Sequence, residues 1–219
     1  MKIFRENIKQ SPYLGIFSTV TEEIALVPES TEQKEMKKLE AALEVEAIKA
    51  SIASSSLIGI LCKGNTNGFV VPEIAEKQEI KDLESKGLKF KVIKGNLALG
   101  NLIAVNEEKA VLSSIIPKKQ REEIAKFLKV EAIEAKIAGN ELVGSSMVLT
   151  SKGFLMNNKA SQKEFDKIRD FLKLEGKATT ANYGDSYIGN SIIANSKAII
   201  AGSLTTNIEI MKIQEGLEN

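Results

Sequence analysis

The 219-residue chain contains no histidine, no tryptophan and a single cysteine. The absence of histidine removes the commonest general base and a common metal ligand, and it excludes both Ser–His and Cys–His catalysis. One cysteine also excludes a disulfide framework. Because Cys62 ends a short apolar run, we expect it to be a small, partly buried structural thiol and not a nucleophile. The sequence therefore predicts no catalytic residue, no metal site and no cofactor.

Strong charge of one sign and long apolar runs are missing as well. Lysine and arginine number 30 against 29 aspartate and glutamate, so no overall cationic field attracts nucleic acid. No apolar stretch approaches the length that crosses a bilayer, and the opening segment MKIFRENIKQ lacks the features of a secretory signal. We therefore expect a cytoplasmic protein without a membrane partner.

A phosphate-binding loop of the Walker type is also absent. The segment KGNTNG, residues 63–68, has two glycines but no following Lys-Ser or Lys-Thr pair. A hairpin turn explains this composition better, because the corresponding places in the rest of the chain also read as turns.

Five copies of one pattern are present, each opening with an apolar residue followed by glycine. The repeat glycines are Gly15, Gly59, Gly100, Gly144 and Gly189. A constant period of this size is typical of a repeat architecture, in which one unit buries its apolar face only against its neighbours. With no linker between the copies, we expect residues 1–219 to form a single domain.

Each copy predicts two strands, a helix and a third strand. A first strand is expected directly after the glycine, for example at Ile16-Phe17 and Ile60-Leu61, and a second about ten residues past the glycine. Apolar residues in steps of three and four then mark a helix, with capping-box spacing from Ser30, Ser161 and Thr206. A third strand of alternating apolar and polar residues follows. The repeat is therefore ββαβ, an α/β unit.

The fifth copy lacks its third strand because the chain ends at Asn219. Met1, Ile3 and Ile8 precede Gly15 at the same distances at which the third-strand residues of the first copy precede Gly59. We therefore expect residues 1–10 to complete the last repeat, which closes the chain into a ring without a free sheet edge.

The repeat segments resemble archaeal-type translation initiation factor 6, a family of ribosome anti-association factors, along nearly the whole chain. The segments that carry the resemblance are residues 47–72, 97–106, 128–153 and 181–206. The resemblance implies a pentein fold, in which five ββαβ repeats form a closed pseudo-fivefold ring, or α/β propeller. It leaves open whether the protein acts in initiation or also in ribosome biogenesis.

The resemblance also implies a partner and a mechanism. The partner is the large ribosomal subunit, at a ribosomal protein of its intersubunit face near the sarcin-ricin loop of the rRNA, and joining with the small subunit is blocked sterically. It implies a monomer with no cofactor, no small-molecule substrate and no catalysis.

Small polar residues before and after the repeat glycines are expected to gather at one rim of the ring. The alternative is that small residues only let the strands turn near a crowded axis. We favour binding, because the subunit-facing surface of the family maps onto these stretches, and Tyr13 and Tyr187 are candidate aromatic anchors. The predicted ribosome-binding residues are Tyr13, Ser56, Ile60, Asn101, Ser145, Ser146, Tyr187 and Asn190.

The chain departs from the family at several positions of this rim. Tyr183 stands where the family commonly has arginine, and Ile60 where eukaryotic members carry a basic residue. Fewer cations favour contact with protein over contact with rRNA. Two alternatives stay open. One is an amidine-modifying pentein enzyme, for which Cys62 is the sole candidate among the catalytic residue types of such enzymes. The other is a ring that binds RNA in general, for which binding to naked RNA would depend steeply on salt.

Overall fold

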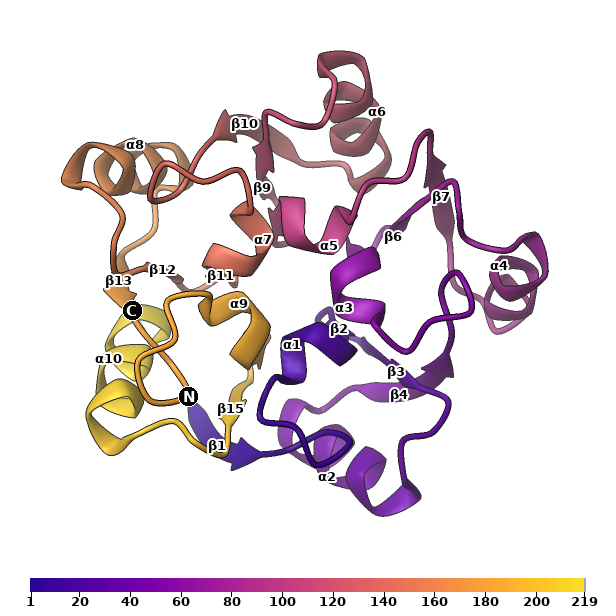
Figure 1. The fold of residues 1–219 in the computed structure, drawn as a ribbon, viewed down its shortest axis with the longest axis horizontal. Coiled ribbons are helices and arrows are strands. Elements are labelled where there is room, and N and C mark those ends of the chain that lie inside the picture. Colours follow the sequence, from indigo (N-terminus) through magenta and orange to yellow (C-terminus); the bar gives the residue numbers. More distant parts are fainter. Residues whose placement is uncertain (219) are drawn as a thin grey trace.

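A computed structural model describes residues 1–218. Within them, five three-stranded sheets stand around a common axis like the blades of a propeller (Figure 1). In every sheet an inner strand pairs antiparallel with a middle strand, and the middle strand pairs parallel with an outer strand. This is the ββαβ pentein arrangement that the sequence predicts.

The strands fall into three concentric sets. The inner strands are β2 (Thr19–Val20), β5 (Lys63–Asn65), β8 (Ile103–Val105), β11 (Met147–Leu149) and β14 (Ile192–Ala194). The middle strands are β3 (Ile24–Pro28), β6 (Gly68–Pro72), β9 (Lys109–Ser113), β12 (Phe154–Asn157) and β15 (Ala198–Gly202). The outer strands are β4 (Glu46–Ala50), β7 (Phe90–Ile93), β10 (Glu131–Ala135), β13 (Gly176–Thr179) and β1 (Lys2–Glu6).

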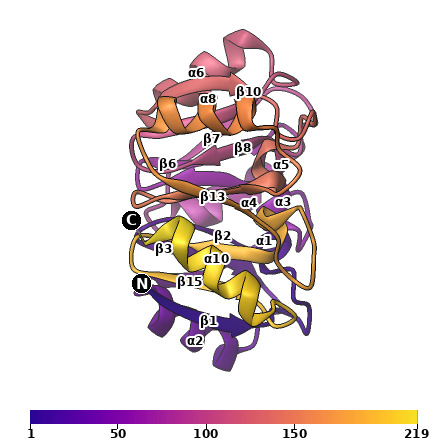
Figure 2. The ribbon, with the colours of Figure 1, turned by 90° about the vertical axis from the view of Figure 1, so that its left-hand side faces the viewer.

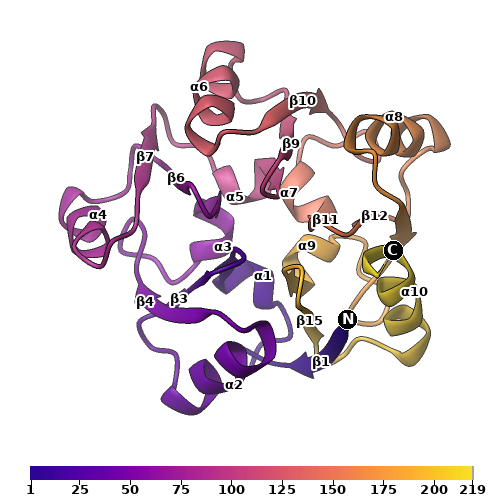
Figure 3. The ribbon, with the colours of Figure 1, turned by 180° about the vertical axis from the view of Figure 1, so that it is seen from behind.

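Two sets of helices accompany the strands. The perimeter helices, which cover the outside of the ring in Figures 1 and 3, are α2 (Gln33–Leu43), α4 (Lys77–Glu84), α6 (Lys118–Leu128), α8 (Gln162–Leu172) and α10 (Asn207–Leu217). The one-turn helices, which surround the axis, are α1 (Leu14–Phe17), α3 (Ile58–Leu61), α5 (Leu99–Leu102), α7 (Val143–Ser146) and α9 (Ile188–Ser191). No helix within residues 1–218 is both long and apolar enough to span a membrane.

The N-terminal strand completes the fifth sheet. β1 pairs parallel with β15, from Lys2 opposite Ala198 to Glu6 opposite Gly202, in the same way that β4 pairs with β3. The amino group of Met1 forms an ion pair with Glu218, so the two ends of the described chain meet in the same repeat. Of residues 1–10, which were expected to complete the last repeat, residues 2–6 form the strand that pairs with β15.

The repeat glycines explain how five units fit around one axis. A Cβ atom added to Gly59 would overlap the carbonyl oxygen of Gly15, and one added to Gly15 would overlap that of Gly189. The same relation links each remaining repeat glycine to the one before it, so the five form a closed circle of backbone contacts. Only glycine leaves room for this approach, which is why it marks every copy.

Asparagines at equivalent positions of the second, third and fifth repeats donate hydrogen bonds across a seam between repeats. The Asn65 amide donates to the carbonyl of Leu128 at 3.0 Å, bridging the second and third repeats. The Asn195 amide donates to the carbonyl of Leu43 at 2.8 Å, bridging the fifth and first. The seam that closes the ring therefore reproduces an internal seam.

Each apolar cluster joins the helix and sheet of one repeat to the sheet of the preceding repeat. Leu26 of β3 packs in one cluster with Phe69 and Val71 of the second repeat, whereas its neighbours Ala25 and Val27 pack on the opposite side, toward the fifth repeat. The middle strands are thus buried on both faces, which accounts for their continuous apolar runs. Every cluster draws residues from two repeats, so the stability of each repeat depends on its neighbour.

Two details of the predicted repeat are wrong. Ile16-Phe17 and Ile60-Leu61 lie in the one-turn helices α1 and α3, and the inner strands begin two residues later. A four-residue apolar run fits a helical turn as well as a strand, so its period cannot distinguish them. The capping box of α2 runs from Glu32 to Glu35 and not from Ser30, whereas those from Ser161 and Thr206 are confirmed.

Candidate functional site

The one-turn helices and the loops before them form one side of the disc, which we call the glycine face. Figure 2 shows these helices on the side opposite the chain termini. The glycine face comprises residues 8–17, 52–61, 94–102, 137–146 and 181–191. All eight predicted ribosome-binding residues belong to it.

Tight turns give the loops of this face a fixed shape. Lys9-Gln10 and Ala53-Ser54 have positive φ at both positions, between 52° and 61°. Each pair is closed by an isolated bridge, Ile8 with Ser11 and Ile52 with Ser55. Consecutive left-handed residues are uncommon outside glycine and are typical of type I′ turns. These turns therefore need an additional stabilising contact.

A glutamate from the perimeter helix supplies that contact in three of the repeats. The Glu79 carboxylate accepts hydrogen bonds from the backbone amides of Ala53 at 2.7 Å and Ser54 at 2.8 Å. Glu209 accepts in the same way from Gly184 at 2.8 Å and Tyr183 at 3.2 Å. We call these contacts the turn clamps; the third is Glu164, which accepts from Gly139 at 2.9 Å.

In two of the turn clamps, those of Glu164 and Glu209, the hydrogen bonds favour the ionised carboxylate. Burial alone raises the pKa of Glu209, but hydrogen bonds from the Thr206 amide, the Thr180 hydroxyl and the Gly184 amide outweigh it and hold the pKa below its ordinary value. The pKa of Glu164 is lowered against burial in the same manner. The same glutamates are the third residues of their helices, so each one caps a helix and holds a turn at once.

The structure divides the eight predicted residues into two groups. Tyr13, Ser56, Ile60, Asn101, Tyr187 and Asn190 are half-buried and present part of their surface on the glycine face. Ser145 and Ser146 are buried, with 3% and 0% of their surface exposed. Their hydroxyls therefore do not lie on the surface that a rigid partner would touch.

Hydrogen bonds connect several of these residues across repeats. The Ser145 hydroxyl donates to Asn101 Oδ1 at 2.9 Å, which links equivalent positions of the third and fourth repeats. The Asn140 amide donates to the Tyr187 hydroxyl at 3.3 Å. The half-buried side chains are thus partly fixed before any partner binds.

Tyr183 and Glu141 also lie on this face, although neither is among the eight predicted binding residues. Tyr183 is 84% exposed, and it was considered only as a replacement for arginine. Glu141 accepts from Lys136 and from the hydroxyls of Ser114 and Ser113, and the Lys136 bond is the largest cause that lowers its pKa to about 2. Glutamate stands twenty residues after Gly15, Gly59, Gly144 and Gly189; the last three of these glutamates form turn clamps, and Glu35 only caps its helix.

The residues that catalysis would need are not gathered on this face. Cys62 is fully buried, more than expected, and burial raises the pKa of its thiol, which opposes formation of a thiolate. Among residues 1–218, no group of three or more cysteine, aspartate or glutamate side chains is arranged to hold a metal ion. The face offers amides, hydroxyls and aromatic rings, which suit recognition of a surface.

Comparisons with known proteins cover the whole chain. A family model described as the eIF-6 family matches residues 3–216. Translation initiation factor 6 of Pyrococcus horikoshii is 36% identical over 224 residues, covering 99% of this chain and 99% of that protein. The protein of the same name from Thermoplasma acidophilum is 34% identical over 215 residues, covering 98% and 99%.

One similar solved structure is DDAH from Pseudomonas aeruginosa in complex with citrulline. It has 15% sequence identity and a TM-score of 0.44, and the match covers 93% of this chain and 72% of that one. At this level of similarity the match carries no conclusion about activity.

Proposed function

The chain belongs to the eIF-6 family of translation initiation factors, and from that premise we propose that it binds the large ribosomal subunit at its intersubunit face. Bound there, the disc occupies the space that the small subunit needs, and joining is prevented sterically. The full-length match to the family is the observation that carries this proposal.

The glycine face is the binding surface in this proposal. Turn clamps hold three of its five loops, which reduces the conformational entropy lost when a partner docks. Its accessible residues include the exposed Tyr183 and the half-buried Tyr187 and Asn190, which suit a mixed apolar and hydrogen-bonding contact. The near-equal numbers of acidic and basic residues favour a ribosomal protein as the main partner, close to the sarcin-ricin loop.

No chemical step is needed for this action. The mechanism is occupancy of a surface by a monomer in the cytoplasm, and it requires neither cofactor nor small-molecule substrate. The six half-buried predicted residues are the ones proposed to touch the subunit; Ser145 acts through Asn101, and Ser146 through packing alone.

Co-sedimentation with isolated archaeal large subunits, followed by light scattering after small subunits are added, tests the proposal. The protein is expected to pellet with large subunits and to slow their joining. The double variant Ile60→Glu with Asn190→Glu places two carboxylates on the glycine face, and it is expected to weaken binding by at least about tenfold.

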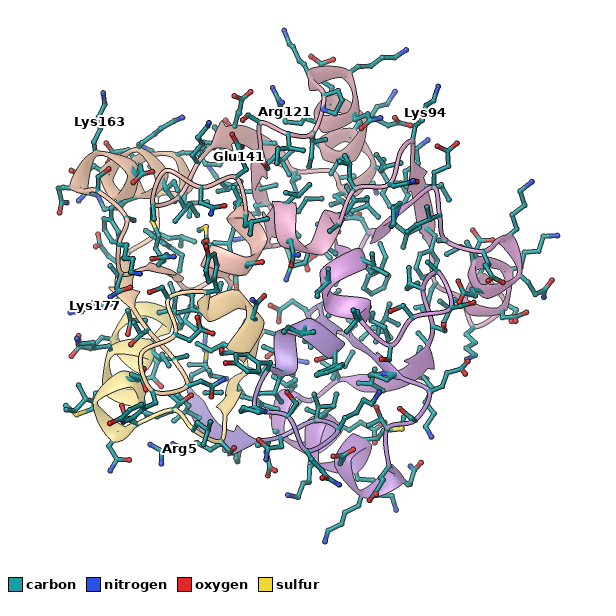
Figure 4. The ribbon with its side chains drawn as sticks, viewed as in Figure 1. Arg5, Lys94, Arg121, Glu141, Lys163 and Lys177 are labelled. Carbon is teal, nitrogen blue, oxygen red and sulfur yellow. The ribbon has the colours of Figure 1, made fainter. Side chains whose placement is uncertain are left out.

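Lys163→Glu on α8 is the matched control, because its side chain points outward from the perimeter (Figure 4). It is expected to bind like the unmodified protein. The proposal is wrong if the unmodified protein does not pellet with large subunits. The assignment of the glycine face is wrong if the folded double variant binds with full affinity.

A further inference from the structure

A small cavity on the ring axis contains a lysine that the proposed function does not use. The cavity lies among the inner strands, and its lining includes Thr19, Lys63, Ala104, Val148 and Ile193. These five residues occupy the same position in the five repeats, four residues after each repeat glycine. Three are apolar and one is a threonine, so the second repeat alone places a charge there.

Lys63 has no partner for its ammonium group within the described chain. Among residues 1–218 no carboxylate forms an ion pair with it, and no carbonyl or hydroxyl accepts a hydrogen bond from its Nζ atom. The described residues that line the cavity include no aspartate or glutamate. Burial lowers the pKa of Lys63, which reflects the lost hydration of its charge.

A second polar group at the same cavity also lacks a partner. The Thr19 hydroxyl is buried and makes no hydrogen bond, although Thr19 lines the cavity and its strand β2 contacts β5, which carries Lys63. A buried hydroxyl without a partner is unfavourable and calls for a bound water or ion. Two polar side chains without a partner in the described chain therefore border one space, and each can donate a hydrogen bond.

We propose that this cavity binds a single small anion of the size of chloride, held by the ammonium group of Lys63 and the hydroxyl of Thr19. The space leaves about 30 Å³ to the centres of water-sized molecules, which suits one monatomic ion and excludes a nucleotide or a peptide. The bound anion neutralises the ammonium group of the half-buried Lys63 and ties the second repeat to the first at the axis. It stabilises the ring and undergoes no chemistry, so it is independent of ribosome binding.

Thermal melting in sodium chloride and in sodium gluconate at equal ionic strength tests the site, since gluconate is too large for the cavity. A tenfold rise in chloride above the dissociation constant is expected to raise the Tm by about 3–6 °C relative to gluconate. Lys63→Met keeps the length of the side chain and is expected to remove this difference. Thr19→Val is expected to reduce it, and Lys163→Met on the perimeter to leave it intact.

Crystals grown with bromide give a second readout through anomalous scattering. A bromide peak within hydrogen-bonding distance of Lys63 Nζ is the expected result. Equal Tm values of the unmodified protein in the two salts, an anion effect that survives Lys63→Met, or a cavity that contains water alone would each overturn the proposal.

Discussion

At the scale of single residues, burial separates two serines that look alike in the sequence. Ser146 follows Ser145 directly, yet its hydroxyl is fully buried and makes no hydrogen bond, whereas that of Ser145 reaches Asn101. An unpaired buried hydroxyl lowers stability, because it loses its bonds to water and gains none in return. We therefore predict that removing the Ser146 hydroxyl does not destabilise the protein.

We expect Ser146→Ala to leave the free energy of unfolding unchanged or to raise it by up to about 1 kcal/mol. Ser18→Ala is the control, because Ser18 is equally buried but its hydroxyl donates to the carbonyl of Leu14 at 2.7 Å. That variant is expected to lose about 0.5–1.5 kcal/mol. Urea unfolding of both variants measures the contrast, and a large loss in Ser146→Ala alone would contradict it.

The turn clamp of Glu209 gives a second prediction at this scale. Glu209→Gln replaces a carboxylate that accepts five hydrogen bonds, divided between its two oxygens, by an amide whose NH2 group faces the donors of one of them. We expect a loss of about 2–3 kcal/mol, since hydrogen bonds to a charged acceptor are lost. Glu122→Gln on the exposed side of α6 is the control, with an expected change within about 0.5 kcal/mol.

The pH dependence of this loss distinguishes the clamp from simple packing. The pKa of Glu209 is lower in the folded chain, so its stabilisation is present above the ordinary glutamate pKa and is lost as the pH falls through the folded value. The Tm difference between the unmodified protein and Glu209→Gln is therefore expected to shrink below about pH 4. A difference that stays constant down to pH 2 would assign the effect to packing.

At the scale of elements, the N-terminal strand is expected to stabilise the entire ring. β1 forms the outer edge of the fifth sheet, and Ile8, just beyond it, is fully buried in the core between the fifth and first repeats. Deleting residues 1–8 is therefore expected to lower the Tm by more than about 10 °C or to prevent folding.

Point variants test the same element where the deletion fails to fold. Ile8→Ala is expected to lose about 2–5 kcal/mol, and Lys2→Ala, which is exposed on the same segment, less than about 0.5 kcal/mol. Calorimetry of both variants measures the difference. An unchanged Tm in the deletion variant would contradict a structural role for β1.

Elements also show where the sequence was informative and where it was not. The repeat glycines predicted five units correctly, because backbone contact at the axis tolerates no other residue. The one-turn helix at Ile60-Leu61 was missed, since four apolar residues have no period that separates a turn from a strand. The capping boxes from Ser161 and Thr206 were visible, but the second contact of their glutamates crosses more than twenty residues and follows only from the folded chain.

At the scale of the whole molecule, the repeats pack in a ring, and this packing does not require the chain to be open at the fifth repeat. In the fifth repeat, the described chain is open between the perimeter helix α10 and the outer strand β1. The equivalent point of the second repeat lies between α4 and β7, at Gly87, which is exposed and has open space around it. Because β7 pairs with its middle strand as β1 does with β15, we expect an opening at the second repeat to be tolerated as well.

We therefore expect a circular permutant that starts at Leu88 and ends at Gly87 to fold, with the old ends joined through a short Gly-Ser linker. β7 then begins the chain and completes its sheet as β1 does naturally. The Tm is expected to stay within about 5 °C of that of the unmodified protein, because exposed loop openings remove few contacts. Large-subunit binding is expected to be retained.

A second permutant, opened between Ala53 and Ser54, supplies the contrast. This break falls inside a turn of the glycine face whose two amides are held by Glu79, so the clamp loses its target geometry. We expect a lower Tm than in the first permutant and weaker binding to large subunits. Because both chains keep every residue and differ only in the opening, equal behaviour would show that the glycine face does not depend on its clamped turns.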